Sequence, residues 1–147
     1  MTIGSAPATT SAQASARLTL YLAVGVGSAI GGLTRWWLSE LMQAGPGGGF
    51  PWGTFWVNLS GSFLVGCYAG LVRPGGRLVH GVRRRLFFMT GFCGGYTSFS
   101  VFSLEAMVLV QHGQPGLAGL YVSGSVLLWL GAVWVGYALA SLSRRSR

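Results

Sequence analysis

The chain has 147 residues, a length typical of one domain, and only 8% of them are charged while 51% are hydrophobic. Soluble domains carry about 25% charged residues, so this composition excludes an ordinary soluble globule. The net charge of +8 arises from ten arginines against Glu40 and Glu105. These arginines lie between or beyond long apolar runs, where membrane topology explains them more simply than nucleic-acid binding does.

The supply of reactive side chains also argues against most enzymes. Two carboxylates, two histidines and no lysine leave little for acid–base catalysis, metal chemistry or a phosphate-binding loop. Cys67 and Cys93 lie inside apolar runs, which is typical of buried thiols and not of a disulfide framework. We therefore do not expect an enzyme.

Along the chain, residues 1–17 are predicted to form a disordered tail, because they are rich in Ser, Ala and Thr. Four apolar segments follow, each at least 21 residues long. A bilayer core of about 30 Å needs about 20 helical residues, and the alternation of barrel strands is missing. The sequence predicts an all-α membrane domain over residues 18–142 and a basic tail over 143–147. The expected spans are 18–38, 51–72, 86–110 and 117–140.

The arginines are distributed unequally about these spans. An even number of spans places both termini and the linker 73–85 on one side, which then carries nine of the ten arginines. The other side has at most Arg35. Positively charged flanks stay in the cytoplasm, so both termini are predicted to lie inside.

Small residues recur at four-residue spacing, at Gly27 and Gly31, Gly66 and Gly70, and in the third segment at Gly91 and Gly95. Such faces let helix backbones approach closely in lipid. They predict tight helix packing, and packing faces on several helices of so short a bundle also favour an oligomer.

The second segment carries a polar stripe. Thr54, Asn58 and Ser62 are four residues apart and share one helix face. A polar stripe is costly against lipid, so it should face the bundle interior or a wet path. An interhelical hydrogen bond made for packing and a functional role both remain open for Asn58.

In the third segment, Gly94-Gly95 is predicted to break the helix near mid-membrane, and hydroxyl groups follow it at Thr97 and Ser98. Transporters expose backbone carbonyls to ions at such breaks, although a simple glycine kink is the alternative. Phe99 and Phe102 are expected to share a face with Glu105. Aromatic edges carry partial positive charge and suit a small anion. Glu105 would repel that anion unless it is protonated or tightly hydrogen-bonded.

The fourth segment extends the polar positions. Tyr121 and Ser125 are four residues apart, and Trp129, one turn further, is expected to end the track.

Together these segments resemble the Fluc (CrcB) family of fluoride channels. The matching residues are Gly31-Gly32 with Arg35, Gly53-Thr54 with Asn58 and Gly61–Phe63, and above all Gly91–Phe102 with Glu105. The resemblance covers about residues 18–140. It implies antiparallel dimers of four-helix subunits, with two narrow pores at the interface that export fluoride passively across the plasma membrane and relieve its toxicity.

The resemblance also implies roles for individual residues. Asn58 would present its amide to fluoride, and Phe99 and Phe102 would flank the ion. The main-chain carbonyls of Gly94 and Thr97 from both subunits would hold a structural sodium ion. The remaining residues assigned to the pore or its mouth are Thr54, Ser62, Glu105, Tyr121, Ser125 and Arg35.

The unequal distribution of arginines about the spans bears on which chain this subunit pairs with. An antiparallel homodimer requires one sequence to insert in both orientations, whereas nine arginines against one should impose a single orientation. We therefore favour pairing with a related chain of opposite bias over a dual-topology homodimer.

Two other functions are compatible with four short helices. A proton-coupled exporter of organic cations needs an accessible intramembrane carboxylate, for which Glu105 is the sole candidate. A non-transporting scaffold would explain the glycine faces, but not the polar stripe, the broken helix and the paired phenylalanines.

Overall fold

The computed structural model describes residues 11–43, 49–72 and 81–142, and every regular element within them is a helix. The elements in chain order are α1 (Ser11–Gln43), α2 (Trp52–Val72), α3 (Val82–Arg85), the π-helix η1 (Leu86–Cys93), α4 (Gly94–Tyr96), α5 (Phe99–Gln111) and α6 (Pro115–Leu142).

Four stretches of helix are long and apolar enough to cross a membrane, which confirms the predicted architecture. They are Gln13–Met42, Trp52–Val72, Val82–Gln111 and Pro115–Leu142, and the third combines α3, η1, α4 and α5. Helix α1 begins at Ser11, so it includes residues 11–17, which the sequence assigned to the tail. Hydroxyl groups in this first part bond back to their own helix, as from Thr19 to the Ser15 carbonyl at 2.9 Å. Residues 1–10 and the basic tail 143–147 lie outside the described residues.

The predicted break in the third span is present, and it lies just beyond the glycine pair. Gly94 and Gly95 are helical, whereas Thr97 (φ −84°, ψ 151°) and Ser98 (φ −144°, ψ 110°) are extended. Gly95 instead provides close packing, because a Cβ there would overlap the Ser28 carbonyl of α1. Ser98 then caps α5, since its hydroxyl accepts a hydrogen bond from the Val101 N–H at 3.2 Å.

The first half of this span differs from an ordinary α-helix. Residues Leu86–Cys93 form a π-helix, in which each carbonyl accepts from the fifth residue along and not the fourth. π-Helical turns are rare and occur often at functional sites. Nothing in the apolar pattern of this segment predicted one.

Glycine faces hold the helices together as expected. Gly27 and Gly31 of α1 lie against η1 and α4, where a Cβ on Gly27 would come within 2.6 Å of the Phe87 carbonyl. On α2, Gly66 and Gly70 lie against α6, and a Cβ on Gly70 would come within 2.9 Å of the Tyr137 carbonyl. These contacts confirm that the small residues allow backbones to approach.

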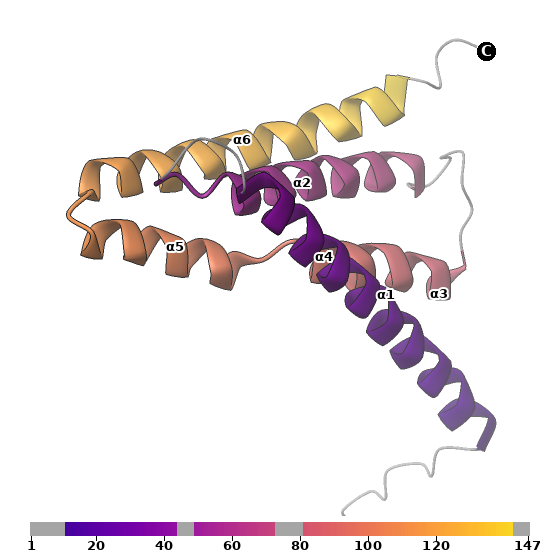
Figure 1. Ribbon diagram of the computed structural model, residues 1–147. Helices are drawn as coiled ribbons and strands as arrows, with labels where there is room; N and C mark the ends of the chain where they lie inside the picture. Colours follow the sequence, from indigo (N-terminus) through magenta and orange to yellow (C-terminus); the bar gives the residue numbers. More distant parts are fainter. Residues whose placement is uncertain (1–10, 44–48, 73–80, 143–147) are drawn as a thin grey trace, which may run out of the picture.

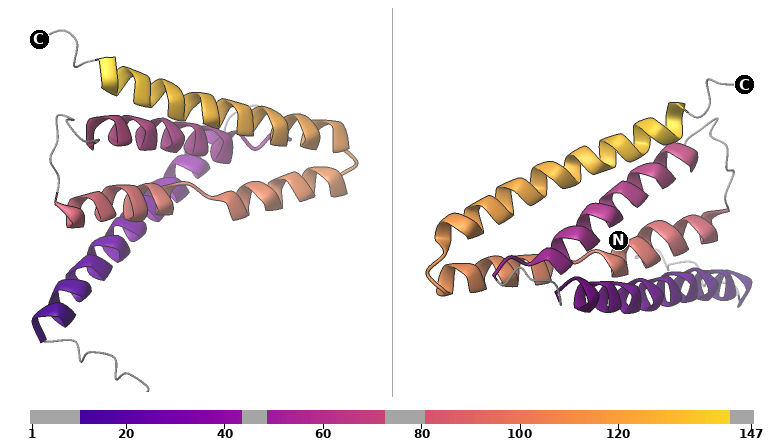
Figure 2. Two further views of the ribbon diagram at one scale, coloured as in Figure 1. Left: turned by 180° about the vertical axis from the view of Figure 1, so that it is seen from behind. Right: turned by 45° about the horizontal axis from the view of Figure 1, so that its top comes forward.

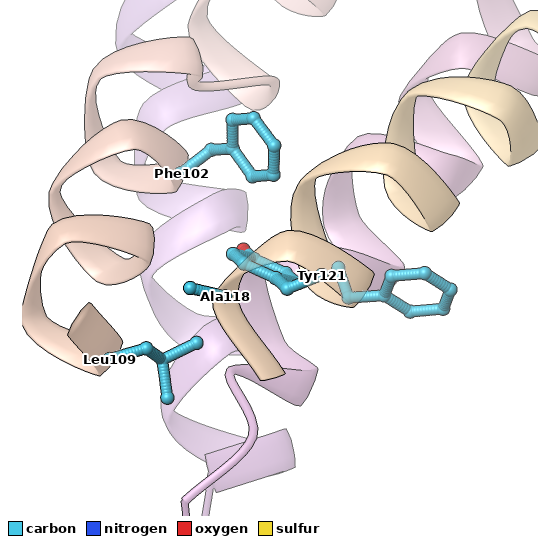
Figure 3. Close-up of a cluster of buried hydrophobic side chains, with 5 residues drawn as sticks. Phe102, Leu109, Ala118 and Tyr121 are labelled. Carbon is cyan, nitrogen blue, oxygen red and sulfur yellow. The ribbon is translucent and has the colours of Figure 1, made fainter. Parts of the chain in front are cut away.

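The spans form two groups in space. Helices α2 and α6 run side by side, and α1 crosses the third span obliquely (Figures 1 and 2). At the opposite end from α3, α5 packs on α6 around a buried cluster that includes Phe102, Leu109, Ala118 and Tyr121, with Phe55 from α2 (Figure 3). Many large apolar side chains face outward, among them Trp134, which is 71% exposed. An outward apolar surface suits a chain surrounded by lipid.

Candidate functional site

The centre of the candidate site is the bond between Asn58 of α2 and the helix break. The Ser98 N–H donates to Asn58 Oδ1 at 2.8 Å, and Asn58 Nδ2 donates to the Ser98 carbonyl at 3.2 Å. Asn58 is only 4% exposed, so the bonds are shielded from solvent. The carboxamide thus replaces helical partners that the break removes, and it keeps a second N–H on Nδ2.

This pairing redirects the backbone of the break. In an unbroken helix the Gly94 carbonyl would accept from the Ser98 N–H, and the Thr97 carbonyl from the Val101 N–H. Here the first N–H donates to Asn58 and the second to the Ser98 hydroxyl. The two carbonyls assigned by resemblance to sodium therefore lose their helical donors, and carbonyl oxygens of this kind are suitable ligands for a hard cation.

A second polar group lies one turn beyond Phe102. The Glu105 carboxylate accepts hydrogen bonds from Thr54 Oγ1 at 2.7 Å and from the Tyr121 hydroxyl at 2.8 Å. Three helices meet in this group, since the donors come from α2 and α6. The sequence predicts that Glu105 is protonated or tightly hydrogen-bonded, and the one donor to each of its oxygens confirms the tight hydrogen bonding.

The two phenylalanines lie together but in different surroundings. Their ring centroids are 5.7 Å apart, yet Phe102 is 2% exposed and Phe99 is 72% exposed. A three-residue step turns a helix by about 300°, and the remaining offset is enough to place one ring inside and the other at the surface. The expected common face is therefore only approximate.

The Phe102 ring contacts two aromatic side chains of α6. Its centroid is 4.9 Å from that of Tyr121 on the Glu105 side and 4.7 Å from that of Trp129 on the other. Figure 3 shows Phe102 projecting from α5 toward the α6 ribbon and lying near Tyr121. A path along the interior from Asn58 to Glu105 would pass this ring.

Two hydrogen-bond donors on one face of α6 have no partner among the described residues. They are the hydroxyl of Ser125, a residue that is 1% exposed, and the indole Nε1 of Trp129. Buried polar groups without partners are costly and rare. Trp129, which the sequence predicts to end the polar track of α6, carries one of these two donors.

A pocket of about 260 Å³ opens beside Asn58. Its lining comes from α2, the break, α5 and α6: Asn58, Ser62, Val65, Thr97, Phe99, Trp129 and Val133. Glu105 lines a different pocket of about 360 Å³, together with His112 at the start of the turn between α5 and α6. The predicted stripe is thus divided, because Ser62 and Asn58 face the first pocket while Thr54 bonds to Glu105.

Other predicted and missed residues can now be placed. Arg35 is half-buried on α1, its Nε atom has no partner among the described residues, and neither pocket lining includes it. Two contributors were not predicted from the sequence, the backbone of Ser98 and the indole N–H of Trp129. A serine directly before an apolar run is a helix-cap signal that would have located Ser98. No local signal identified Trp129.

Comparison with known proteins agrees with this geometry. Residues 22–137 match the family model described as CrcB-like protein, Camphor Resistance (CrcB). The chain is 46% identical over 126 residues to a protein of Bradyrhizobium diazoefficiens named fluoride-specific ion channel FluC 1, covering 86% of this chain and 87% of that one. It is 46% identical over 125 residues to the fluoride-specific ion channel FluC of Paramagnetospirillum magneticum, covering 85% and 98% of the two chains. The chain therefore belongs to the CrcB family of multi-pass membrane proteins.

Proposed function

We propose that this chain is the subunit of a fluoride-selective channel that lets fluoride leave the cell passively. The observation that carries the proposal is the group of uncharged donors around Phe102. The Ser125 hydroxyl and the Trp129 N–H are buried without partners among the described residues, and Trp129 lines the same pocket as the Asn58 amide. Fluoride is small and strongly hydrated, so a pore must replace its water with such donors. The names of the relatives support the same function.

The arrangement suits passive conduction better than proton-coupled exchange. Both Glu105 oxygens already accept hydrogen bonds, from Thr54 and Tyr121, so the carboxylate is engaged inside the subunit. An exporter of organic cations would need that charge at its binding site. Phe102 is placed to offer a ring edge to an ion that moves between the two pockets.

The direct test is fluoride efflux from liposomes that contain the purified protein, with chloride efflux as the selectivity control. We expect fluoride to leave and chloride to be retained. Phe102→Ile removes the ring, and Asn58→Asp replaces an amide donor with a negative charge, so both variants should conduct fluoride more slowly. Unchanged fluoride flux in both variants would refute the assignment of these residues to the pore.

We further propose that the active unit is a dimer of antiparallel subunits. Phe99 is 72% exposed beside the pocket that contains Asn58, so a second subunit would complete the wall of a pore there. The carbonyls of Gly94 and Thr97 from both subunits would hold a sodium ion, which would join the two breaks electrostatically. Loss of the helical donors of these carbonyls supports this assignment.

The orientation follows from the arginines. The C-terminal ends of α2 and α6 and the short helix α3 lie at one end of the molecule (Figure 1). The arginine-rich linker and tail adjoin this end, which we propose is cytoplasmic. We favour a related chain of opposite bias as the partner over a second copy in dual topology.

The orientation and the partner can be tested together by expressing this chain alone in cells with a tag at each end. We expect both tags to be protected from a membrane-impermeant label. A large population in both orientations would instead identify a dual-topology homodimer.

A further inference from the structure

A third pocket, of about 260 Å³, lies between α2 and η1, away from the site described above. Its lining is almost wholly apolar: Leu64, Cys67, Tyr68, Leu71, Phe88, Phe92 and Cys93. Within it the rings of Tyr68 and Phe88 lie 5.7 Å apart between centroids. The pocket thus joins the second span to the π-helical part of the third.

This pocket faces a different direction from the candidate anion pocket. On α2 the anion pocket uses Asn58, Ser62 and Val65, whereas the apolar pocket uses residues such as Leu64 and Leu71. Positions 58, 62 and 65 share one helical face, and positions 64 and 71 share another more than a third of a turn away. Leu64 and Phe88, which line the pocket, are 43% and 44% exposed. The pocket therefore opens on the outer surface of the subunit.

Positive charge stands at one end of the pocket. Arg84 and Arg85 are exposed, and they end the short helix α3, which leads directly into the π-helical wall of the pocket. Arg84 precedes Phe88 by four residues, so it lies about one helical turn beyond the pocket wall. Helix α2 ends at Val72 and leads into the linker, which contains further arginines. The apolar pocket thus lies inside the bilayer, and the arginine side chains lie at its end near the membrane–water boundary.

We propose that this pocket binds one anionic phospholipid, with an acyl chain between α2 and η1 and the phosphate at Arg84 and Arg85. An acyl chain fits the apolar lining, and the head group complements the arginines, which attract acidic lipids at a membrane surface. A zwitterionic lipid would gain the apolar contact but little of the electrostatic attraction. The bound lipid would hold the second span against the π-helix.

The test uses the purified protein in detergent after equilibration with mixed phosphatidylglycerol and phosphatidylcholine, with retained lipid measured by native mass spectrometry. The wild-type chain should retain phosphatidylglycerol in preference to phosphatidylcholine. Arg84→Gln and Arg85→Gln should each lower retained phosphatidylglycerol about fivefold, the effect of one surface arginine on acidic-lipid binding. Arg17→Gln, an exposed arginine on α1, is the matched control and should change little.

A second variant examines the apolar part. Leu64→Trp should fill the pocket and remove both lipids, while an unchanged elution profile shows that the protein still folds. Equal retention of the two lipids by the wild type, or unchanged retention in both arginine variants, would overturn the proposal. The proposal would also be overturned if the purified wild type retained no lipid and its oligomer dissociated in the Leu64→Trp variant, because a second subunit would then occupy the pocket. None of these outcomes depends on fluoride conduction.

Discussion

The carboxamide of Asn58 bonds both backbone groups of Ser98, at 2.8 Å and 3.2 Å, and so bridges α2 to the break in the third span. One side chain thereby does two things. It satisfies the buried backbone of the break, and it brings its remaining N–H to the pocket wall. The structural and functional explanations of Asn58 that the sequence left open are therefore compatible.

Asn58→Ala should destabilise the protein by about 1–3 kcal/mol, because the Ser98 N–H and carbonyl would lose a buried partner. The measurement is thermal or denaturant unfolding in detergent. Ser123→Ala is the control, since the Ser123 hydroxyl bonds only within its own helix, to the Gly119 carbonyl. An Asn58→Ala protein as stable as the wild type would contradict the bridging role.

Trp129→Phe should test the indole donor of Trp129. The substitution keeps a ring beside Phe102 but removes the Nε1 donor, which has no partner among the described residues. Trp129 packs against the buried cluster, so the smaller ring should lose some packing energy but no hydrogen bond, whereas fluoride efflux from liposomes should slow. Trp134→Phe alters a side chain that is 71% exposed and should leave the flux unchanged. Equal flux in the two variants would remove Trp129 from the anion path.

Tyr121→Phe should cost about 1 kcal/mol of stability, because it leaves one oxygen of the half-buried Glu105 without its donor. Thr54→Val removes the donor to the other oxygen. Since the two donors share one carboxylate, their effects on the free energy of unfolding should not add in the double variant. Tyr21→Phe, at a residue 72% exposed, is the control for loss of a tyrosine hydroxyl. Strict additivity would indicate that the three side chains do not act as one group.

Gly31→Ala should destabilise the packing of α1 on the third span by about 1–3 kcal/mol. Its Cβ would overlap the Phe92 carbonyl and lie 2.8 Å from the Tyr96 nitrogen, and backbone atoms cannot turn aside as a flexible side chain can. Gly25→Ala, on the same helix, meets nothing within 4 Å and should be neutral or stabilising through its helix propensity. The difference in melting temperature between the two variants is the measurement, and equal values would count against close backbone packing here.

Replacing sodium with potassium or N-methylglucamine should lower the fraction of dimer in detergent and slow fluoride efflux. The proposed ligands are main-chain carbonyls, so Thr97→Val, which loses only the hydroxyl bonded to the Cys93 carbonyl, should keep the same dependence on sodium. Insensitivity of the wild type to the cation, or loss of the sodium dependence in Thr97→Val, would argue against ligation by these carbonyls.

The helix break shows which structural features the local sequence can predict and which it cannot. Gly94-Gly95 correctly indicated an interruption in the third span, but the extended residues are Thr97 and Ser98. Their position depends on Asn58, forty residues earlier in the chain, which accepts the N–H that would otherwise continue the helix. Propensity within one segment cannot contain that information.

Length, composition and arginine placement by themselves determined that this is an all-α membrane protein with four spans, because a bilayer imposes a minimum apolar length on each helix. The residue pattern also indicated its family. Only the tertiary structure decided which polar groups meet. It paired Glu105 with Thr54 and Tyr121, separated Phe99 from Phe102 by exposure, and left the Trp129 N–H without a partner in the part of the chain that the structure describes. Helical periodicity assigns faces within one helix, but contacts between helices depend on how closely glycine faces let their backbones approach.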